Sequence, residues 1–273
     1  MGKRKSVRTG ARLGQHFLTG TWAATTLVKA TGMTASDTVL EIGPGKGALT
    51  KEILKTGARV VAIEKDAALV EKLTETFRKE VASGHLQLHS GDVRDFSPEK
   101  SGLRAEKYIL AANIPYYITG EIIRQFLSSD TQPYTMALLV QKEVAQRILG
   151  ARRLPAGRQG KESILSISVK VYGQPKIVAK VSRGNFSPSP SVDSAILLVS
   201  NISKSFFTDL DEKLFFTVVR AGFSSKRKKL SSNLSVWGKE KVARIFESLG
   251  LSENVRAEDV SVEQWKYIAK NLI

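Results

Sequence analysis

The sequence predicts an α/β fold, in which a doubly wound, mostly parallel sheet is followed by a small all-helical domain. Short apolar runs alternate with helical patterns up to about residue 200, and only helical patterns follow. A glycine-rich turn, GPGKG at residues 43–47, comes directly after the first apolar run. This alternation is typical of a parallel sheet that binds ligands at the carboxyl ends of its strands. We therefore expect a ligand-binding domain at residues 1–200 and a helical domain at residues 201–273.

The expected strands are short apolar segments bounded by turn residues. They lie at residues 38–43, 58–64, 85–90, 107–113 and 135–141. Apolar residues spaced by three and four positions predict helices between them, at residues 47–57, 66–82, 119–129 and 142–150. Residues 164–172 and 194–200 alternate without a helical pattern between them, which predicts an antiparallel pair at one edge of the sheet.

The last part of the chain contains four helical patterns. They cover residues 209–223, 226–235, 239–250 and 261–272. Ser261 and Gln264 have the spacing of a capping box, which predicts the start of the last helix.

The composition indicates a polyanionic partner. The formal net charge is +16 and the isoelectric point is about 10.0, which favours nucleic acid. An anionic membrane is the alternative, but no apolar run reaches the ~18 residues that a membrane span needs. The chain has no cysteine, and its three histidines have no accompanying carboxylate cluster, so no disulfide and no metal site are expected. We expect a cytoplasmic monomer.

A glycine turn and two acids predict a nucleoside cofactor without phosphates. Gly43 and Gly45 lie between the first expected strand and the first helix, where glycine lets a ligand approach the backbone. The GxGxG spacing is neither the dinucleotide fingerprint nor a P-loop. Glu64 ends the second strand, where it would accept from a ribose diol, and Asp92 follows the third, beside the base. Together they fit S-adenosylmethionine, although either acid alone would equally suit a turn cap.

The tetrapeptide NIPY follows the fourth expected strand and suits chemistry on an adenine amine. That amine is a poor nucleophile, because its lone pair is delocalised into the ring. The amide oxygen of Asn113 and the carbonyl of Ile114 would accept its two hydrogens, while Pro115 fixes the turn. Tyr116 would stack on the base, with Phe186 as a second aromatic face. The alternatives are an ordinary turn for the tetrapeptide and a core position for Phe186.

Nine segments resemble the family of ribosomal RNA adenine N6,N6-dimethyltransferases. They include GQHFL at residues 14–18, LEIGPGKGALT, VVAIEKD, GDVRDF, NIPYYIT, NFSPSPSVDSAILLV and AGFSSKRKKLSSNL. The resemblance is strongest to the kasugamycin-sensitivity methylase branch. It implies a class I S-adenosylmethionine-dependent methyltransferase fold. It also implies dimethylation of two adjacent adenines near the 3′ end of small-subunit ribosomal RNA, during ribosome assembly.

The resemblance also implies roles for individual residues. His16 and Leu18 would close over the methionine end of the cofactor, and Asn113 would be shared between the cofactor and the target amine. Tyr116 and Phe186 would lie around the target base. Gly43 would line the cofactor, Glu64 would hold its ribose, and Asp92 would hold its adenine.

The chain departs from the family's pattern at two positions, and one loop is unusually long. The family usually has asparagine in place of His16, and Asn-Ile-Ser-Thr in place of residues 117–120. The first difference replaces an amide by an imidazole at the cofactor, and the second alters the pocket around a partly methylated amine. The loop at residues 152–161 is longer than the family's, and we assign no function to it or to Tyr117.

Two basic segments are expected to contact RNA phosphates, which predicts a steep salt dependence. The partner implied by the family is small-subunit ribosomal RNA within an immature small ribosomal subunit. The expected RNA-binding residues are Arg4, Arg8 and Arg12 in the N-terminal arm, and Arg220, Lys226, Arg227, Lys228 and Lys229 in the helical domain.

Two other functions compete with this one. The first is the antibiotic-resistance type of enzyme, which dimethylates an adenine of large-subunit ribosomal RNA. The second is a largely non-catalytic RNA-binding assembly or transcription factor on the same fold. The C-terminal segments favour the small-subunit branch, and intact acids and NIPY favour catalysis.

Overall fold

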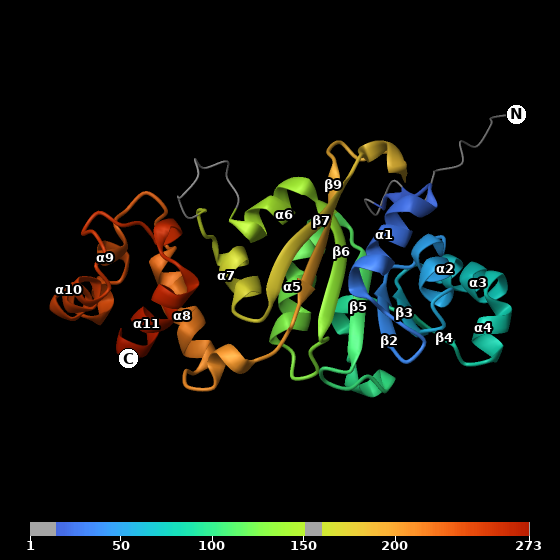
Figure 1. Cartoon of the computed structure of the whole chain (residues 1–273), viewed down its shortest axis with the longest axis horizontal. Helices are drawn as coiled ribbons and strands as arrows, with labels where there is room; N and C mark the ends of the chain where they lie inside the picture. Colours follow the sequence, from blue (N-terminus) through green and yellow to red (C-terminus); the bar gives the residue numbers. More distant parts are fainter. Residues whose placement is uncertain (1–14, 151–159, 273) are drawn as a thin grey trace, which may run out of the picture. The chain divides into compact units, whose positions relative to one another are not determined.

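The computed structural model describes residues 15–150 and 160–272, which divide into two compact units (Figure 1). The first unit contains the described residues up to Ala145 together with Lys176–Ser200. The second contains the described residues of Gln146–Pro175 and those from Asn201 onward. Residues 146–150 and 160–175 therefore group with the C-terminal helices, whereas the sequence predicts a helical domain that begins at residue 201.

A seven-stranded sheet forms the centre of the first unit and confirms the predicted fold class. Its strand order is β4-β3-β2-β5-β6-β9-β7. The strands are β2 (Thr38–Ile42), β3 (Arg59–Glu64), β4 (Leu86–Ser90), β5 (Tyr108–Asn113), β6 (Thr135–Gln141), β7 (Gln174–Val181) and β9 (Ser194–Ser200). Strands β4, β3, β2, β5 and β6 pair in parallel, and β9 pairs antiparallel with β6. The five predicted parallel strands are confirmed.

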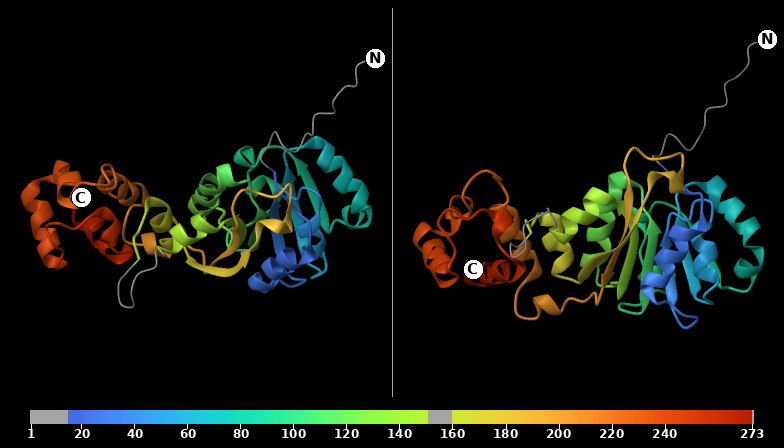
Figure 2. Two further views of the ribbon diagram at one scale, coloured as in Figure 1. Left: turned by 90° about the horizontal axis from the view of Figure 1, so that it is seen from above. Right: turned by 45° about the horizontal axis from the view of Figure 1, so that its top comes forward.

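Helices cover both faces of this sheet, because its central strands β2, β3, β5 and β6 are largely apolar on both sides. Val39, Val60 and Ile109 lie opposite one another in the register and join the core beneath the first three helices. Side chains alternate along a strand, so neighbours such as Leu40 face the other side, and they too are buried. Figure 2 shows α1 and α5 on opposite sides of the sheet. The helices of this unit are α1 (Thr21–Thr31), α2 (Ala48–Leu54), α3 (Ala67–Thr76), α4 (Arg78–Ala82) and α5 (Thr119–Ser128). Helix α6 (Lys142–Leu149) begins in the first unit and ends in the second.

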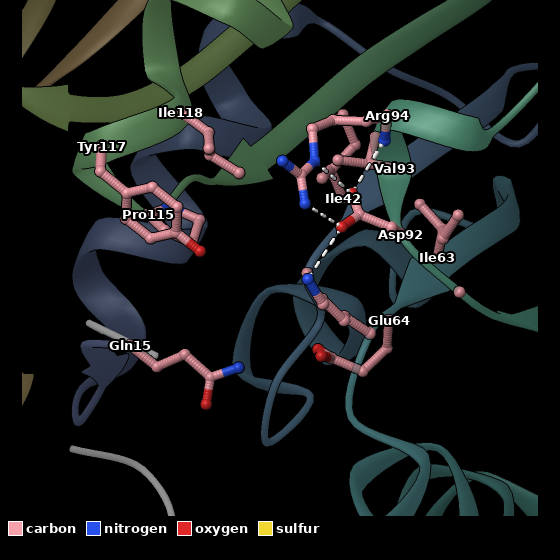
Figure 3. Close-up of a pocket in the computed structure, with 13 residues that line it drawn as sticks. Gln15, Ile42, Ile63, Glu64, Asp92, Val93, Arg94, Pro115, Tyr117 and Ile118 are labelled. Carbon is pink, nitrogen blue, oxygen red and sulfur yellow. Dashed lines mark hydrogen bonds and ion pairs between the residues drawn. The ribbon is translucent and has the colours of Figure 1, made fainter. Parts of the chain in front are cut away.

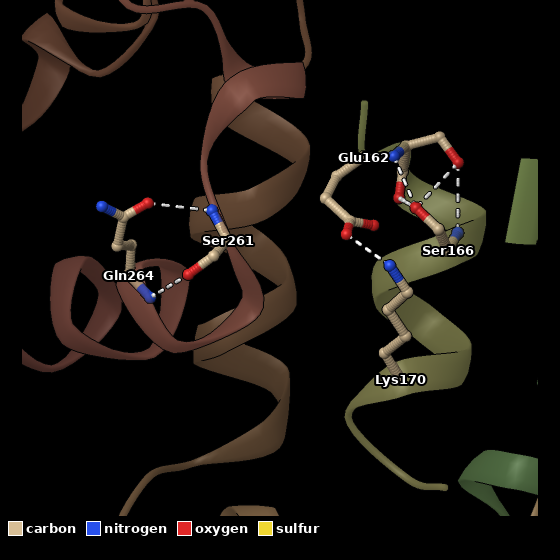
Figure 4. A network of polar contacts seen from close by, with 6 residues as sticks. Glu162, Ser166, Lys170, Ser261 and Gln264 are labelled. Atoms are coloured by element: carbon tan, nitrogen blue, oxygen red, sulfur yellow. Dashed lines mark hydrogen bonds and ion pairs between the residues drawn. The ribbon is translucent and has the colours of Figure 1, made fainter. Parts of the chain in front are cut away.

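The strand predicted at residues 164–172 is wrong, because Ile164–Lys170 forms helix α7. Ser163 and Ser166 make a capping box at its start (Figure 4). The buried Ser168 donates its hydroxyl to the carbonyl of Ile164, so a serine pattern that resembles strand alternation is satisfied inside a helix. The edge strand is β7 instead. It carries a proline and two lysines, as edge strands often do, and these hid its pattern.

Helices α8 to α11 make up most of the second unit. They are α8 (Glu212–Gly222), α9 (Leu230–Asn233), α10 (Lys239–Ser248) and α11 (Val262–Leu272). The Ser261 hydroxyl accepts from the Gln264 N–H, and the Gln264 side chain accepts from the Ser261 N–H, which confirms the predicted capping box (Figure 4). Trp265 of α11 is fully buried beside Phe223. No helix in the described ranges is long and apolar enough to cross a membrane.

Short elements complete the chain. A two-stranded sheet joins β1 (Phe17–Leu18) to β8 (Phe186–Ser187) in antiparallel pairing. The 3₁₀ turns are η2 (Val93–Asp95), η3 (Glu99–Ser101), η4 (Tyr116–Ile118), η5 (Arg183–Asn185), η6 (Ser205–Phe207), η7 (Ser235–Trp237) and η8 (Ala257–Asp259).

Candidate active site

The carboxyl ends of four parallel strands bring the predicted site residues into one row. The order β4-β3-β2-β5 places Asp92, Glu64, Gly43 and Asn113 in turn along one edge of the sheet. Neighbouring strands are about 4.8 Å apart, so the row extends over about 14 Å. From β2 the chain adds β3 and β4 on one side of the sheet, and then β5 and β6 on the other side. The loops that follow β2 and β5 therefore diverge, and a crevice opens between them. An elongated ligand lying along this edge would meet all four residues.

Glu64 is tied to the glycine turn. Its carboxylate is 3% exposed, and its two oxygens accept from the N–H groups of Gly45 and Asp66, each at 3.0 Å. Gly43 has φ 65°, and a Cβ there would meet nothing within 4 Å, so its backbone faces open pocket space. A carboxylate has about four lone-pair sites, which leaves Glu64 able to accept from a ribose diol as well.

Asp92 is held by two cations that the sequence analysis did not connect with it (Figure 3). Oδ1 accepts from the backbone N–H and the Nε of Arg94, each at 3.0 Å. Oδ2 accepts from Arg94 Nη2 at 2.5 Å and from Lys65 Nζ at 2.9 Å. The hydrogen bonds from Arg94, followed by that from Lys65, hold the pKa of Asp92 well below its usual range. Asp92 is therefore an ionised acceptor.

Asn113 has an amide whose orientation is fixed. Its Nδ2 donates to the main-chain carbonyl of His16 at 2.8 Å, which leaves Oδ1 as the free end. Neither Asn113 Oδ1 nor the Ile114 carbonyl accepts a hydrogen bond from any described residue. The two acceptors expected for an adenine amine are therefore adjacent in the chain and available.

Tyr116 is held at its hydroxyl by a hydrogen bond and at its ring by a stacking contact. The hydroxyl forms a hydrogen bond of 2.7 Å with Ser194 Oγ, and the half-buried ring stacks on the His16 ring with centroids 5.6 Å apart. Burial raises the pKa of Tyr116, so the phenol is neutral at pH 7. Pro115 precedes it at φ −56°, and the carbonyl of Pro115 accepts from the Ile118 N–H, which closes the turn.

The GQHFL segment places one of its two expected residues, His16, in the crevice, together with two that were not expected. Gln15, His16 and Phe17 line the crevice, whereas Leu18 lines neither of its pockets and instead packs against the core. The Nδ1 of His16 lies 2.7 Å from the carbonyl of Pro188. Gly14 lies outside the described residues. Gln15 was overlooked, although it stands within the motif itself.

Phe186 is placed differently from the prediction. Its side chain is 4% exposed and belongs to the core, and its backbone pairs with Leu18. It lines neither pocket of the crevice. This is the core position that the sequence analysis gave as the alternative. Stacking of Phe186 on a target base stays a prediction that requires the ring to leave its packing.

The crevice consists of two pockets that share Gln15, Gly43, Glu64 and Pro115. The first extends toward Asp92 and contains Ile42 and Ile63 as apolar walls (Figure 3). The second extends toward Asn113 and contains His16, Phe17 and Tyr116. Acidic acceptors beside apolar walls at one end, and an open glycine backbone in the middle, fit an adenosine-containing cofactor that has no phosphate. Tyr117, at the rim of the first pocket, is 68% exposed.

Glu41 is a buried acid that sequence reasoning missed. It lies in β2, two residues before the glycine turn, and is 1% exposed. Its Oε2 has no hydrogen-bond partner among the described residues. Burial, only partly offset by the neighbouring Thr50, raises the pKa of Glu41 to about 8. The sequence did not indicate that Glu41 is buried, because a single acid in a short apolar strand can equally be a solvent-facing residue.

The basic residues expected to contact RNA are only partly described. Arg4, Arg8 and Arg12 lie outside the described residues. In the second unit, Arg220 and residues 226–229 are exposed. The last of them, Lys229, also lines a groove with Lys239, Arg244 and three serines, namely Ser231, Ser232 and Ser235.

Comparison with known proteins identifies the family. A profile described as ribosomal RNA adenine dimethylase matches residues 7–273. The chain belongs to this family. A relative from Dehalococcoides mccartyi, named ribosomal RNA small subunit methyltransferase A, is 37% identical over 93% of this chain and 85% of its own. The family assignment makes the protein an S-adenosylmethionine-dependent ribosomal RNA adenine dimethylase.

Two solved structures share the dimethylase fold. A dimethyladenosine transferase from Plasmodium falciparum has a TM-score of 0.76 at 24% identity, covering 93% of this chain and 97% of that one. The 23S rRNA methyltransferase ErmE has a TM-score of 0.74 at 23% identity, covering 94% and 99%. At these identities the likeness concerns the fold alone, so it does not distinguish small-subunit from large-subunit substrates.

Proposed function

We propose that this dimethylase modifies two adjacent adenines near the 3′ end of small-subunit ribosomal RNA, as a cytoplasmic monomer acting on immature small subunits. The observation that carries the chemistry is the pair of free acceptors, Asn113 Oδ1 and the Ile114 carbonyl, on the wall of the crevice. The small-subunit assignment is supported by relatives of that name at 33–37% identity. No comparable observation favours a large-subunit substrate.

The site residues would assist methyl transfer by orienting the target amine. S-adenosylmethionine supplies an electrophilic methyl group. Asn113 Oδ1 and the Ile114 carbonyl would accept the two amine hydrogens, which favours the pyramidal nitrogen whose lone pair can attack. Holding the reacting atoms about 3 to 3.5 Å apart and in line supplies most of the rate. No general base is required, because the proton leaves after the methyl group has moved.

The target adenine would enter the second pocket as an unstacked base. A base inside a helix cannot reach a crevice wall, so the nucleotide must be flipped out or single-stranded. Tyr116 would provide the stacking face, which is worth roughly 1 to 3 kcal/mol per base. The His16 ring now stacks on Tyr116 and would have to yield this face to the base. A hydrogen bond to Ser194 keeps the tyrosine in place meanwhile.

The deciding experiment is methyl transfer to purified immature small subunits, with large subunits assayed in parallel. The product nucleosides would be identified by mass spectrometry. We expect dimethylated adenine at two neighbouring positions of small-subunit RNA. Methylation of large-subunit RNA alone would instead support the antibiotic-resistance type, and binding without methyl transfer would support a non-catalytic factor.

Replacing Glu64 with glutamine should weaken binding of S-adenosylhomocysteine about 10- to 100-fold. The substitution puts an amide NH₂ against a backbone N–H donor and removes a charged acceptor, and hydrogen bonds to charged groups contribute about 1.5 to 3 kcal/mol. Calorimetric titration measures the change, with thermal unfolding as the check on folding. Affinity within twofold of the wild type would exclude a ribose contact at Glu64.

Binding to small-subunit RNA should weaken steeply with salt, and less steeply after charge removal in the second unit. Each phosphate contact contributes about 0.7 to 0.9 to the slope of log K against log salt. The double variant Arg227→Ala, Lys228→Ala should lower that slope by about one to two. The control Lys72→Ala, Lys79→Ala removes two charges on helices α3 and α4, away from both pockets. Equal slopes for the two double variants would contradict RNA contact at residues 227–228.

A further inference from the structure

The carboxylate of Asp92 has no acceptor capacity left in this structure. A carboxylate offers about four lone-pair sites. Four donors fill them at 2.5 to 3.0 Å, namely the backbone N–H, Nε and Nη2 of Arg94 and the Nζ of Lys65. An adenine amine can therefore reach Asp92 only if one of these donors leaves.

The four donors differ in how easily they can leave. Asp92 caps the 3₁₀ turn that begins at Val93, and the bond from the backbone of Arg94 is part of that cap. The two side-chain bonds of Arg94 come from one planar guanidinium, which is a fixed fork that fits a carboxylate. Lys65 makes a single contact through a flexible stem, and its side chain is 53% exposed. The ammonium can therefore move into water at little cost, since exposed ion pairs contribute only about 0 to 1 kcal/mol.

Both cations lie where the base is expected. Lys65 and Arg94 line the first pocket together with Asp92, and the apolar walls Ile42 and Ile63 belong to the same pocket (Figure 3). A planar base between these walls would approach Asp92 from the side of the pocket. It would meet the lysine contact there as a competitor for one lone pair.

We propose that these two cations act in opposite directions on adenine recognition. Lys65 competes with the adenine amine for Asp92, and Arg94 is a positioning residue that holds the carboxylate so that it can receive the amine. The inference rests on the proposed function only in taking adenosine to be the nucleoside bound in this pocket. Two like charges beside one acid thus set how strongly the site distinguishes an amine-bearing purine from one without the amine.

The test compares adenosine with purine riboside, which lacks the exocyclic amine. Both nucleosides are neutral, so a general change in electrostatic potential affects them alike. The measured quantity is the ratio of the two dissociation constants, purine riboside over adenosine, from calorimetric titration. Lys65→Met should raise this ratio about two- to fivefold, since it removes an exposed ion pair and keeps the stem. Arg94→Met should lower the ratio about threefold or more, because the carboxylate loses the two guanidinium hydrogen bonds that hold it in place.

Control variants make the outcome decisive. Lys55→Met removes another exposed lysine, one paired with Glu52 at 2.6 Å and outside both pockets, and should leave the ratio unchanged. Lys65→Ala should agree with Lys65→Met in direction. A ratio that is unchanged or lowered in both Lys65 variants, or raised in Arg94→Met, overturns the inference while the proposed function stands. A wild-type protein that binds neither nucleoside nor S-adenosylhomocysteine overturns both.

Discussion

Alanine at position 113 is expected to reduce methyl transfer about 10²- to 10³-fold while S-adenosylhomocysteine binds within a few-fold of the wild type. The expected loss is that of one preorganised polar group aimed at the reacting centre. Asn113 Oδ1 is free, whereas Nδ2 is engaged by the His16 carbonyl at 2.8 Å, so the substitution removes an oriented acceptor. Single-turnover methylation of small subunits with excess enzyme isolates this step from RNA binding and product release.

The matched control for this substitution is Asn271→Ala. Asn271 also donates its amide to a main-chain carbonyl at 2.8 Å, but it lies on α11, in the second unit. It should leave the single-turnover rate unchanged. Full activity in Asn113→Ala, or an equal loss in both variants, would show that the amide oxygen is not part of the chemistry.

The parallel sheet and its ligand edge could be predicted because both depend on backbone periodicity. Strands β2, β3, β5 and β6 are largely apolar and buried on both faces. The residues at the carboxyl ends of the parallel strands meet at one edge of the sheet, whatever their side chains are. Helix α7 could not be predicted in the same way. Its alternating serines imitate a strand, and only their hydrogen bonds within the turn show that they suit a helix. Helix α1 was missed because its threonines disguise the apolar face at Ala23, Ala24, Leu27 and Val28.

Within the site, the sequence predicted where residues lie better than it predicted which side chains they form hydrogen bonds with. Glu64, Asp92 and Asn113 lie along the predicted edge, because strand order and length determine where a strand-end residue lies. The saturation of Asp92 by Lys65 and Arg94 depends on rotamers and on a contact between two different loops. No periodic pattern encodes such contacts.

Glu41 combines complete burial with a carboxyl group, and this makes stability depend on pH. The pKa of Glu41 is raised from 4.5 to about 8, chiefly by burial. Between these values the unfolded chain releases a proton that the folded protein keeps. Each pH unit in this window therefore lowers the free energy of unfolding by about 1.4 kcal/mol. Below pH 4.5 and above pH 8 the contribution is constant, because both states then have the same protonation.

Replacing Glu41 with glutamine should remove this dependence, because glutamine imitates the neutral acid at every pH. We expect the free energy of unfolding of Glu41→Gln, relative to the wild type, to rise by roughly 2 to 4 kcal/mol between pH 5 and pH 8. Urea denaturation at pH 5, 6.5 and 8 measures the difference. Glu75→Gln, on the exposed side of α3, is the control and should differ from the wild type by the same amount at each pH. A difference for Glu41→Gln that does not change with pH would mean that Glu41 is ionised in the folded protein. The strand beneath the glycine turn would then carry a buried negative charge.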